Sequence, residues 1–282
     1  MWTTWAFDLM GMNDAAMRHL AFLGGLVRQE ERPECPKGSL PFAAYANGVD
    51  AAPAAMLDAQ AAASFLWAVA KHAERLSDTE RAQFVGERWK TVEMASGFLV
   101  NWADPATRLP LPSFRVERLR DGRDDDLLVS AYIGMQSATR LAKWAAVDKP
   151  DWRVRQTDLE SLARYRLLDD QNRWKPADPL RYWASGLVPR ESPAWDEAVT
   201  AALKALDTVD ADELPDRLVA LATLTKTRPD ARAQFVQALP VAIKRAMGLP
   251  AEGSYTESHA PVLIGSPAAA KLIVAMVLLF QS

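Results

Sequence analysis

Side chains suited to binding a partner are concentrated in the stretch DDQNRWKPADPLRYWASGL, residues 169–187. Tryptophan, tyrosine and arginine dominate the energetics of protein interfaces, and surface loops present such residues more often than cores do. The alternative is a helix cap at Asp178 and Pro179 with the aromatic rings turned into the core. The binding site that we predict comprises Asp169, Asp170, Arg173, Trp174, Lys175, Arg181, Tyr182 and Trp183.

A wider basic and aromatic window surrounds this stretch. Between Arg115 and Arg190, fifteen Lys and Arg residues stand against twelve Asp and Glu residues, and the tryptophans there have basic neighbours in sequence. Rings interleaved with cations are typical of proteins that bind single-stranded nucleic acid. The acidic residues interrupt the positive charge, and the whole chain has a net charge of -3. Nucleic acid is therefore a disfavoured third alternative.

Two groups of carboxylates could serve an enzyme. Asp124–Asp126 and Asp169–Asp170 could hold Mg²⁺ or act as general acid and base. Neighbouring residues on a helix point about 100° apart, so neither group forms a ligand cage alone. These acids support the alternative of an all-α enzyme that uses Asp and Arg side chains on a phosphorylated or nucleotide-derived substrate. We assign no catalytic residue and do not favour an enzyme.

Metal, redox and cofactor motifs are missing from the sequence. Its three histidines form no H-E-x-x-H pattern, and Cys35 is the single cysteine. No G-x-S-x-G, Walker A or G-x-G-x-x-G motif is present. We expect neither a metal nor a cofactor.

The apolar residues recur mostly at three- and four-residue steps, which predicts an all-α fold. We expect an irregular multi-helix bundle or helical array of about ten helices, and a possible small β-hairpin near 113–123. Prolines mark several helix starts, S/T-x-x-E boxes at Ser77 and Thr157 mark two more, and Pro240 should kink or split its helix. The predicted helices span residues 13–29, 53–76, 78–102, 125–147, 158–168, 179–185, 193–208, 212–226, 230–247 and 267–281.

The aromatic residues divide the chain unevenly. All ten tryptophans precede residue 196, and the remainder of the chain uses mainly Ala, Leu and Val. This shift predicts an aromatic-rich helical portion over residues 1–190 and an Ala/Leu-rich four-helix portion over residues 191–282. The two portions could also pack as one continuous domain.

Together these patterns favour a soluble helical module that binds another protein through an aromatic and arginine surface. An adaptor, an accessory chaperone and an immunity-type binder all fit. The N-terminus has no pattern of a secretory signal, so we expect a cytoplasmic protein. The apolar run at residues 272–280 is shorter than the roughly 20 residues that cross a bilayer, so we expect no membrane span.

Overall fold

The computed structural model describes residues 1–32, 35–41, 44–51, 57, 59–111, 124–247 and 267–280. These residues are mainly helical, and their β-pairing is limited to isolated bridges such as the one between Pro41 and Leu57. The predicted all-α fold class is therefore confirmed. The candidate hairpin near 113–123 lies outside the described residues.

The helices form two compact units that each bury apolar side chains. Unit 1 comprises Met1 and residues 13–168, and unit 2 comprises residues 2–12 and 169–282. This division is defined by contacts between residues. The boundary near residue 190 is inferred from the change in amino-acid composition and stays a prediction about domains. Because the first helix joins unit 2, that unit is built from both ends of the sequence.

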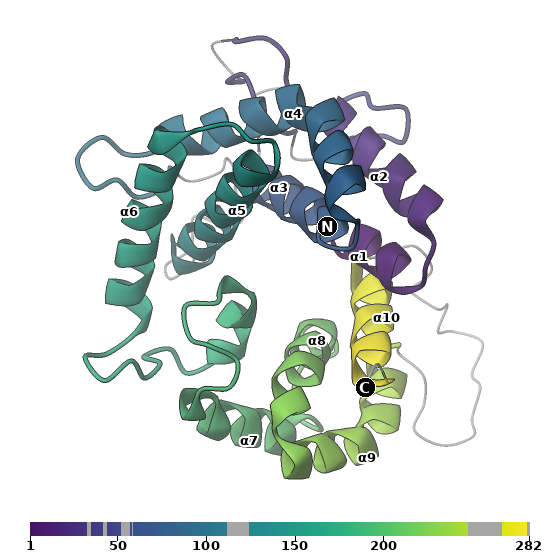
Figure 1. Ribbon diagram of the computed structural model, residues 1–282. Coiled ribbons are helices and arrows are strands. Elements are labelled where there is room, and N and C mark those ends of the chain that lie inside the picture. The colour runs from purple at the N-terminus through teal and green to yellow at the C-terminus, as the bar shows by residue number, and fades with distance from the viewer. Residues whose placement is uncertain are drawn as a thin grey trace. The chain divides into compact units, whose positions relative to one another are not determined.

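Unit 1 is centred on two helices that pack side by side, α3 and α5 (Figure 1). Helix α5 also packs against α6, and α4 contacts both α3 and α5. Gly134 of α5 permits the close approach to α3, since a Cβ there would lie 2.7 Å from Ala63 Cα. The helices of this unit are α2 (Asn13–Gly25), α3 (Ala59–Ala73), α4 (Asp78–Asn101), α5 (Asp124–Trp144) and α6 (Pro150–Leu167).

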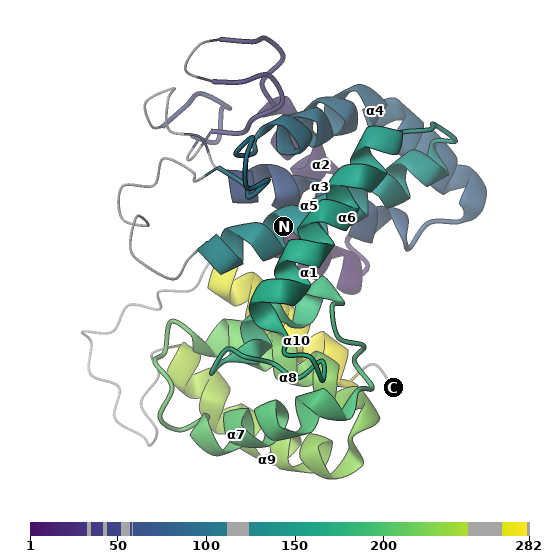
Figure 2. The same ribbon diagram turned by 90° about the vertical axis from the view of Figure 1, so that its left-hand side faces the viewer.

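Unit 2 is centred on α8, whose residues are mostly buried. Helix α8 packs against α10, α9 and the 3₁₀ helix η2, and α1 lies beside α10 (Figures 1 and 2). The elements of this unit are α1 (Trp2–Leu9), η2 (Pro179–Ser185), η3 (Pro193–Trp195), α7 (Asp196–Ala205), α8 (Leu214–Leu224), η4 (Thr225–Thr227), α9 (Pro229–Ala246) and α10 (Pro267–Phe280).

One of the two predicted capping boxes is real. Ser77 accepts a hydrogen bond from the backbone of Glu80, and the Glu80 carboxylate accepts one from the Ser77 backbone N–H at 3.0 Å. The box predicted at Thr157 is wrong, because α6 begins at Pro150 and the Thr157 hydroxyl donates to the Arg153 carbonyl inside the helix. Proline at the first helical position supplies the start that the box pattern placed too late.

Other predicted boundaries need correction. Helix α1 was not expected, and the predicted helix 53–76 begins in the structure at Ala59, since Leu57 forms a bridge with Pro41. Residues 193–195 form a separate 3₁₀ turn ahead of α7. Pro240 does not split its helix, because α9 continues to Ala246.

In the part of the chain that the structure describes, no helix is both long and apolar enough to cross a membrane.

Candidate interaction site

The tryptophans do not present an exposed aromatic surface. All ten lie in described residues, and each is buried or half-buried. The buried ones are Trp67, Trp152, Trp183 and Trp195, and the half-buried ones are Trp2, Trp5, Trp89, Trp102, Trp144 and Trp174. In the predicted site, therefore, the exposed chemistry comes from the charged residues and not from the indole rings.

Asp169 organises the first half of the predicted site. Its carboxylate accepts hydrogen bonds from the backbone N–H groups of Gln171 and Arg173 at 2.9 and 2.8 Å, and from Arg173 Nε at 2.8 Å. The turn is closed by Asn172, which has a left-handed φ of 57°. The backbone hydrogen bond from Arg173 is the main reason that the pKa of Asp169 lies below its usual value. This carboxylate is thus ionised and fully engaged in holding the turn.

Trp174 leads the chain from this turn into an aromatic cluster. Its ring stacks on Tyr182 with centroids 6.3 Å apart, and it meets Trp195 at 4.7 Å. Trp195 Nε1 donates to the Pro189 carbonyl at 3.1 Å. The Trp174 Nε1 atom is buried without a hydrogen-bond partner among the described residues. Trp174, Tyr182 and Trp195 therefore fix the loop to η2 and to η3.

Trp183 belongs to a second series of rings, which we call the tryptophan ladder and which comprises Trp2, Trp5 and Trp183. Trp183 stacks on Trp5 with centroids 6.4 Å apart, and Trp5 lies 5.7 Å from Trp2. A cation lies over each end of the ladder. The Arg190 guanidinium is 5.7 Å from the Trp183 ring centre, and Lys271 Nζ is 5.6 Å from that of Trp2.

The structure brings together some of the predicted site residues. Asp169 pairs with Arg173, and Trp174 stacks on Tyr182. The side chains of Asp170, Arg173, Lys175 and Arg181 are exposed. The Asp169 carboxylate is engaged in its own turn, whereas the neighbouring Asp170 side chain points to a different, exposed environment.

The other acidic group also has a structural role. Asp125 and Asp126 lie in the first turn of α5, where negative charge is favoured by the helix dipole. Asp125 forms an ion pair with Arg166 at 2.5 Å, which joins α5 to α6 within unit 1. In the ranges that the structure describes, no cluster of three or more His, Cys, Asp or Glu side chains could hold a metal ion.

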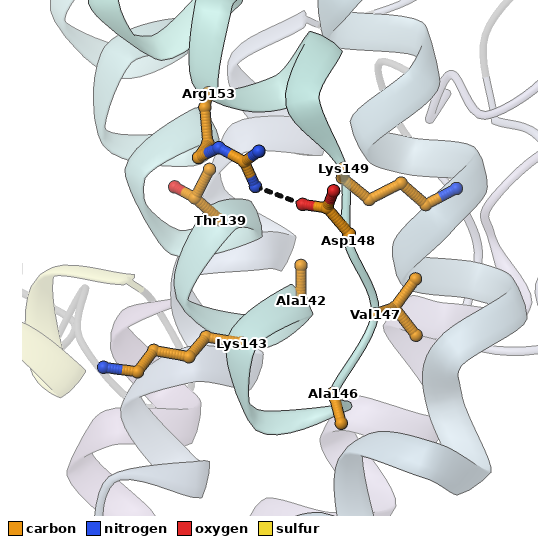
Figure 3. A pocket seen from close by; sticks show the side chains of 8 residues that line it. All are labelled: Thr139, Ala142, Lys143, Ala146, Val147, Asp148, Lys149 and Arg153. Carbon is orange, nitrogen blue, oxygen red and sulfur yellow. Dashed lines mark hydrogen bonds and ion pairs between the residues drawn. The ribbon is translucent and has the colours of Figure 1, made fainter.

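A hollow of about 440 Å³ lies in unit 1 between the end of α5 and the start of α6. It is lined by Thr139, Ala142, Lys143, Ala146, Val147, Asp148, Lys149 and Arg153. Figure 3 shows that the ammonium groups of Lys143 and Lys149 point away from each other, and that Arg153 is bound to Asp148. The cations of this hollow are thus not focused on a common ligand position.

Comparison of the chain with protein-family models, curated proteins and solved structures gives no significant match.

The sequence did not reveal two residues that complete the site. Trp5 supports Trp183 from the first helix, and the Arg190 guanidinium lies over the same ring. The signal for Arg190 was present, because it closes the basic window and follows Trp183 by one short connection. Nothing local indicated Trp5, since its partner is far away in sequence.

Proposed function

We propose that this chain is a protein-binding module that uses the surface around residues 169–190 of unit 2. The observation that supports this function is that buried and half-buried rings hold charged side chains in defined positions at the surface. Asp169 fixes the turn that carries Arg173, and Trp183 lies beneath Arg190. Side chains that are ordered before binding lose less entropy when a partner docks, which favours affinity.

The surface around residues 169–190 is mainly charged and polar, whereas the sequence predicts a surface of aromatic and arginine side chains. The aromatic anchors are internal, so recognition depends on exposed arginine and lysine. An adaptor, an accessory chaperone and an immunity-type binder remain the roles that fit such a surface. The proposed cytoplasmic location rests on the sequence patterns given above.

Site-specific photo-crosslinking in the native cell tests this function. A photoreactive residue placed at Gln171 or Ala177 leaves every cation of the surface intact, and both positions are exposed. We expect each variant to crosslink to one stoichiometric protein partner. The control carries the same residue at exposed Gln83 of α4 in unit 1 and should yield no such product. Equal products from all three positions, or none from Gln171 and Ala177, would refute the function.

A further inference from the structure

Three cations of unit 2 gather where the segment after η2 meets η4 and α9. We call Arg190, Lys226 and Arg232 the cation cluster. Arg190 and Lys226 are exposed, and Arg232 is half-buried at the end of the first turn of α9. None of the three forms an ion pair with a described carboxylate, although ion pairs are frequent elsewhere in unit 2.

Hydrogen bonds of Arg228 join the backbone that carries Arg190 to the start of α9. Arg228 Nη1 donates to the Arg190 carbonyl at 2.8 Å, and Nη2 donates to the Ser192 carbonyl at 2.7 Å. The Arg232 backbone N–H in turn donates to the Arg228 carbonyl at 2.8 Å. The segment that carries Arg190 is therefore attached directly to Arg228. This residue connects η4, which contains Lys226, with α9, which contains Arg232.

Around the cation cluster, positive charge exceeds negative charge by one, since Arg190, Lys226, Arg228 and Arg232 stand against Asp196, Glu191 and Asp230. Arg228 is compensated by Asp196, whose carboxylate lies 2.7 Å from Nε. Glu191 and Asp230 are exposed neighbours in sequence, but neither forms an ion pair with a member of the cation cluster. The pKa of Lys226 lies below its usual value because the ammonium is partly desolvated and because Arg232 and Arg190 repel it. A negatively charged partner would relieve this repulsion.

Apolar surface adjoins the cations. Arg232 Nη2 donates to the Leu279 carbonyl at 2.5 Å, which places it next to Phe280 at the end of α10. The Phe280 side chain is 74% exposed, and Val236, one helical turn beyond Arg232, is 42% exposed. Phe280 and Val236 thus supply exposed apolar side chains on the two helices that Arg232 joins.

We propose that the cation cluster, together with Phe280 and Val236, binds an acidic peptide segment of a protein partner that also carries apolar side chains. This inference rests on the proposed function and identifies the chemistry of the partner. Carboxylates of the segment would pair with Arg190, Lys226 and Arg232, and its apolar side chains would cover Phe280. Single-stranded nucleic acid fits less well, because successive bases need several exposed rings for stacking. Trp183 is buried beneath Arg190, and among the five residues of the proposed surface Phe280 alone offers a ring.

The test measures the fluorescence anisotropy of a labelled peptide in the presence of the whole 282-residue chain. The probe is a fluorescein-labelled peptide in which pairs of Glu alternate with Leu or Phe, and its first control replaces Leu and Phe by Ser. We expect saturable binding of the probe that weakens as salt is raised, and several-fold weaker binding of the Ser peptide. Labelled oligothymidylate serves as the nucleic-acid arm, and tighter binding of this strand than of the peptide would overturn the proposal.

Charge reversal localises the binding. Lys226→Glu should weaken probe binding about tenfold, since it replaces an attraction by a repulsion. Lys244→Glu makes the same change in net charge at an exposed position near the other end of α9, and should weaken binding less than about twofold. Lys226→Ala, which introduces no repulsion, should give an intermediate loss. Equal effects of the two reversals would show attraction by net charge alone and would overturn the proposal.

The two proposals fail separately. If Gln171 and Ala177 crosslink a partner but Lys226→Glu leaves the probe affinity unchanged, the protein-binding function stands and the acidic-segment inference is wrong. If the probe binds with the expected dependence on Lys226 but no partner crosslinks in the cell, the proposed function is wrong at residues 169–190.

Discussion

At the level of single residues, the indole N–H groups of the site differ in a way that stability measurements can detect. Trp195 Nε1 has a hydrogen-bond acceptor in the Pro189 carbonyl, whereas the Trp174 Nε1 atom is buried without a partner among the described residues. Burying a polar atom without a hydrogen bond costs free energy, and a satisfied one contributes to stability. Trp174 and Trp195 pack against each other, but only the N–H group of Trp195 stabilises the fold through a hydrogen bond.

Replacement of each indole by a phenyl ring tests this difference. Trp174→Phe and Trp195→Phe remove similar volumes, but only the second also removes a hydrogen bond. We expect Trp195→Phe to lower the free energy of unfolding by about 1 kcal/mol more than Trp174→Phe. Urea unfolding monitored by circular dichroism gives both values. A larger loss for Trp174→Phe would mean that its N–H has an acceptor in solution.

The two S/T-x-x-E boxes provide a second comparison of this kind. Ser77 caps α4, and its hydrogen bonds lower the pKa of Glu80, so the cap is strongest with Glu80 ionised. Ser77→Ala should cost about 1 kcal/mol at neutral pH, while Thr157→Ala inside α6 should cost less than about 0.5 kcal/mol.

The pH dependence of this comparison has a definite sign. Because the pKa of Glu80 is lower in the folded chain than in the unfolded chain, its contribution is present above the unfolded value. It is lost as the pH falls through the folded pKa. The difference between wild type and Ser77→Ala, measured by urea unfolding over a pH series, should therefore shrink in acid. A difference that does not change with pH would show that the Glu80 carboxylate takes no part in the cap.

At the level of elements, the close approach of α3 and α5 depends on the lack of a side chain at Gly134. A Cβ at this position would lie 2.7 Å from Ala63 Cα and 2.9 Å from Leu99 Cδ1, so neighbouring helices would have to move. Gly86, in the interior of α4, lies on an exposed face, and a Cβ there would meet no heavy atom within 4 Å. The same substitution should thus have opposite effects at the two glycines.

Thermal and urea unfolding of the two alanine variants check this expectation. Gly134→Ala should lower the free energy of unfolding by about 1–3 kcal/mol through overpacking. Gly86→Ala should raise it by up to about 1 kcal/mol, because alanine has the higher helix propensity. Equal effects at both sites would indicate that α5 moves away from α3 at little cost.

The helix boundaries show which elements could be predicted from sequence. Prolines at residues 179, 193 and 229 stand at the observed starts of η2, η3 and α9, because the missing N–H is harmless there. The start of α6 was misplaced because Thr157 and Glu160 imitate a cap inside a helix that had already begun. Helix α1 was missed because its stability comes from packing against α10, which no local pattern expresses.

At the level of the whole molecule, the sequence could locate the tryptophans but not their environment. The stretch 169–183 was predicted as a site from residue types alone, and the structure describes all of it. The inward position of Trp183 depends on Trp5, which comes from the other end of the chain. This contact forms because unit 2 combines residues 2–12 with residues 169–282. The periodicity of apolar residues within either segment does not indicate that the two segments pack together.

This arrangement predicts that two tryptophan variants act on different units. Trp5→Ala removes the ring that stacks on Trp183 in unit 2, and Trp89→Ala removes the ring that lies 5.6 Å from Trp152 in unit 1. Both rings are half-buried, so each change should cost about 2 kcal/mol. Hydrogen exchange followed by mass spectrometry should show faster exchange in α10 and η2 for Trp5→Ala, and in α4 and α6 for Trp89→Ala.

The comparison of Trp5→Ala with Trp89→Ala shows which helices each tryptophan stabilises. Each variant serves as the control for the other, because the residue type, the exposure class and the substitution are the same. If each accelerates exchange in its own unit, residues 2–12 stabilise the fold that they join and not the helices that follow them in sequence. If both variants accelerate exchange across α3 and α8 alike, the two units open as a single cooperative structure, and the N-terminal helix stabilises the whole chain.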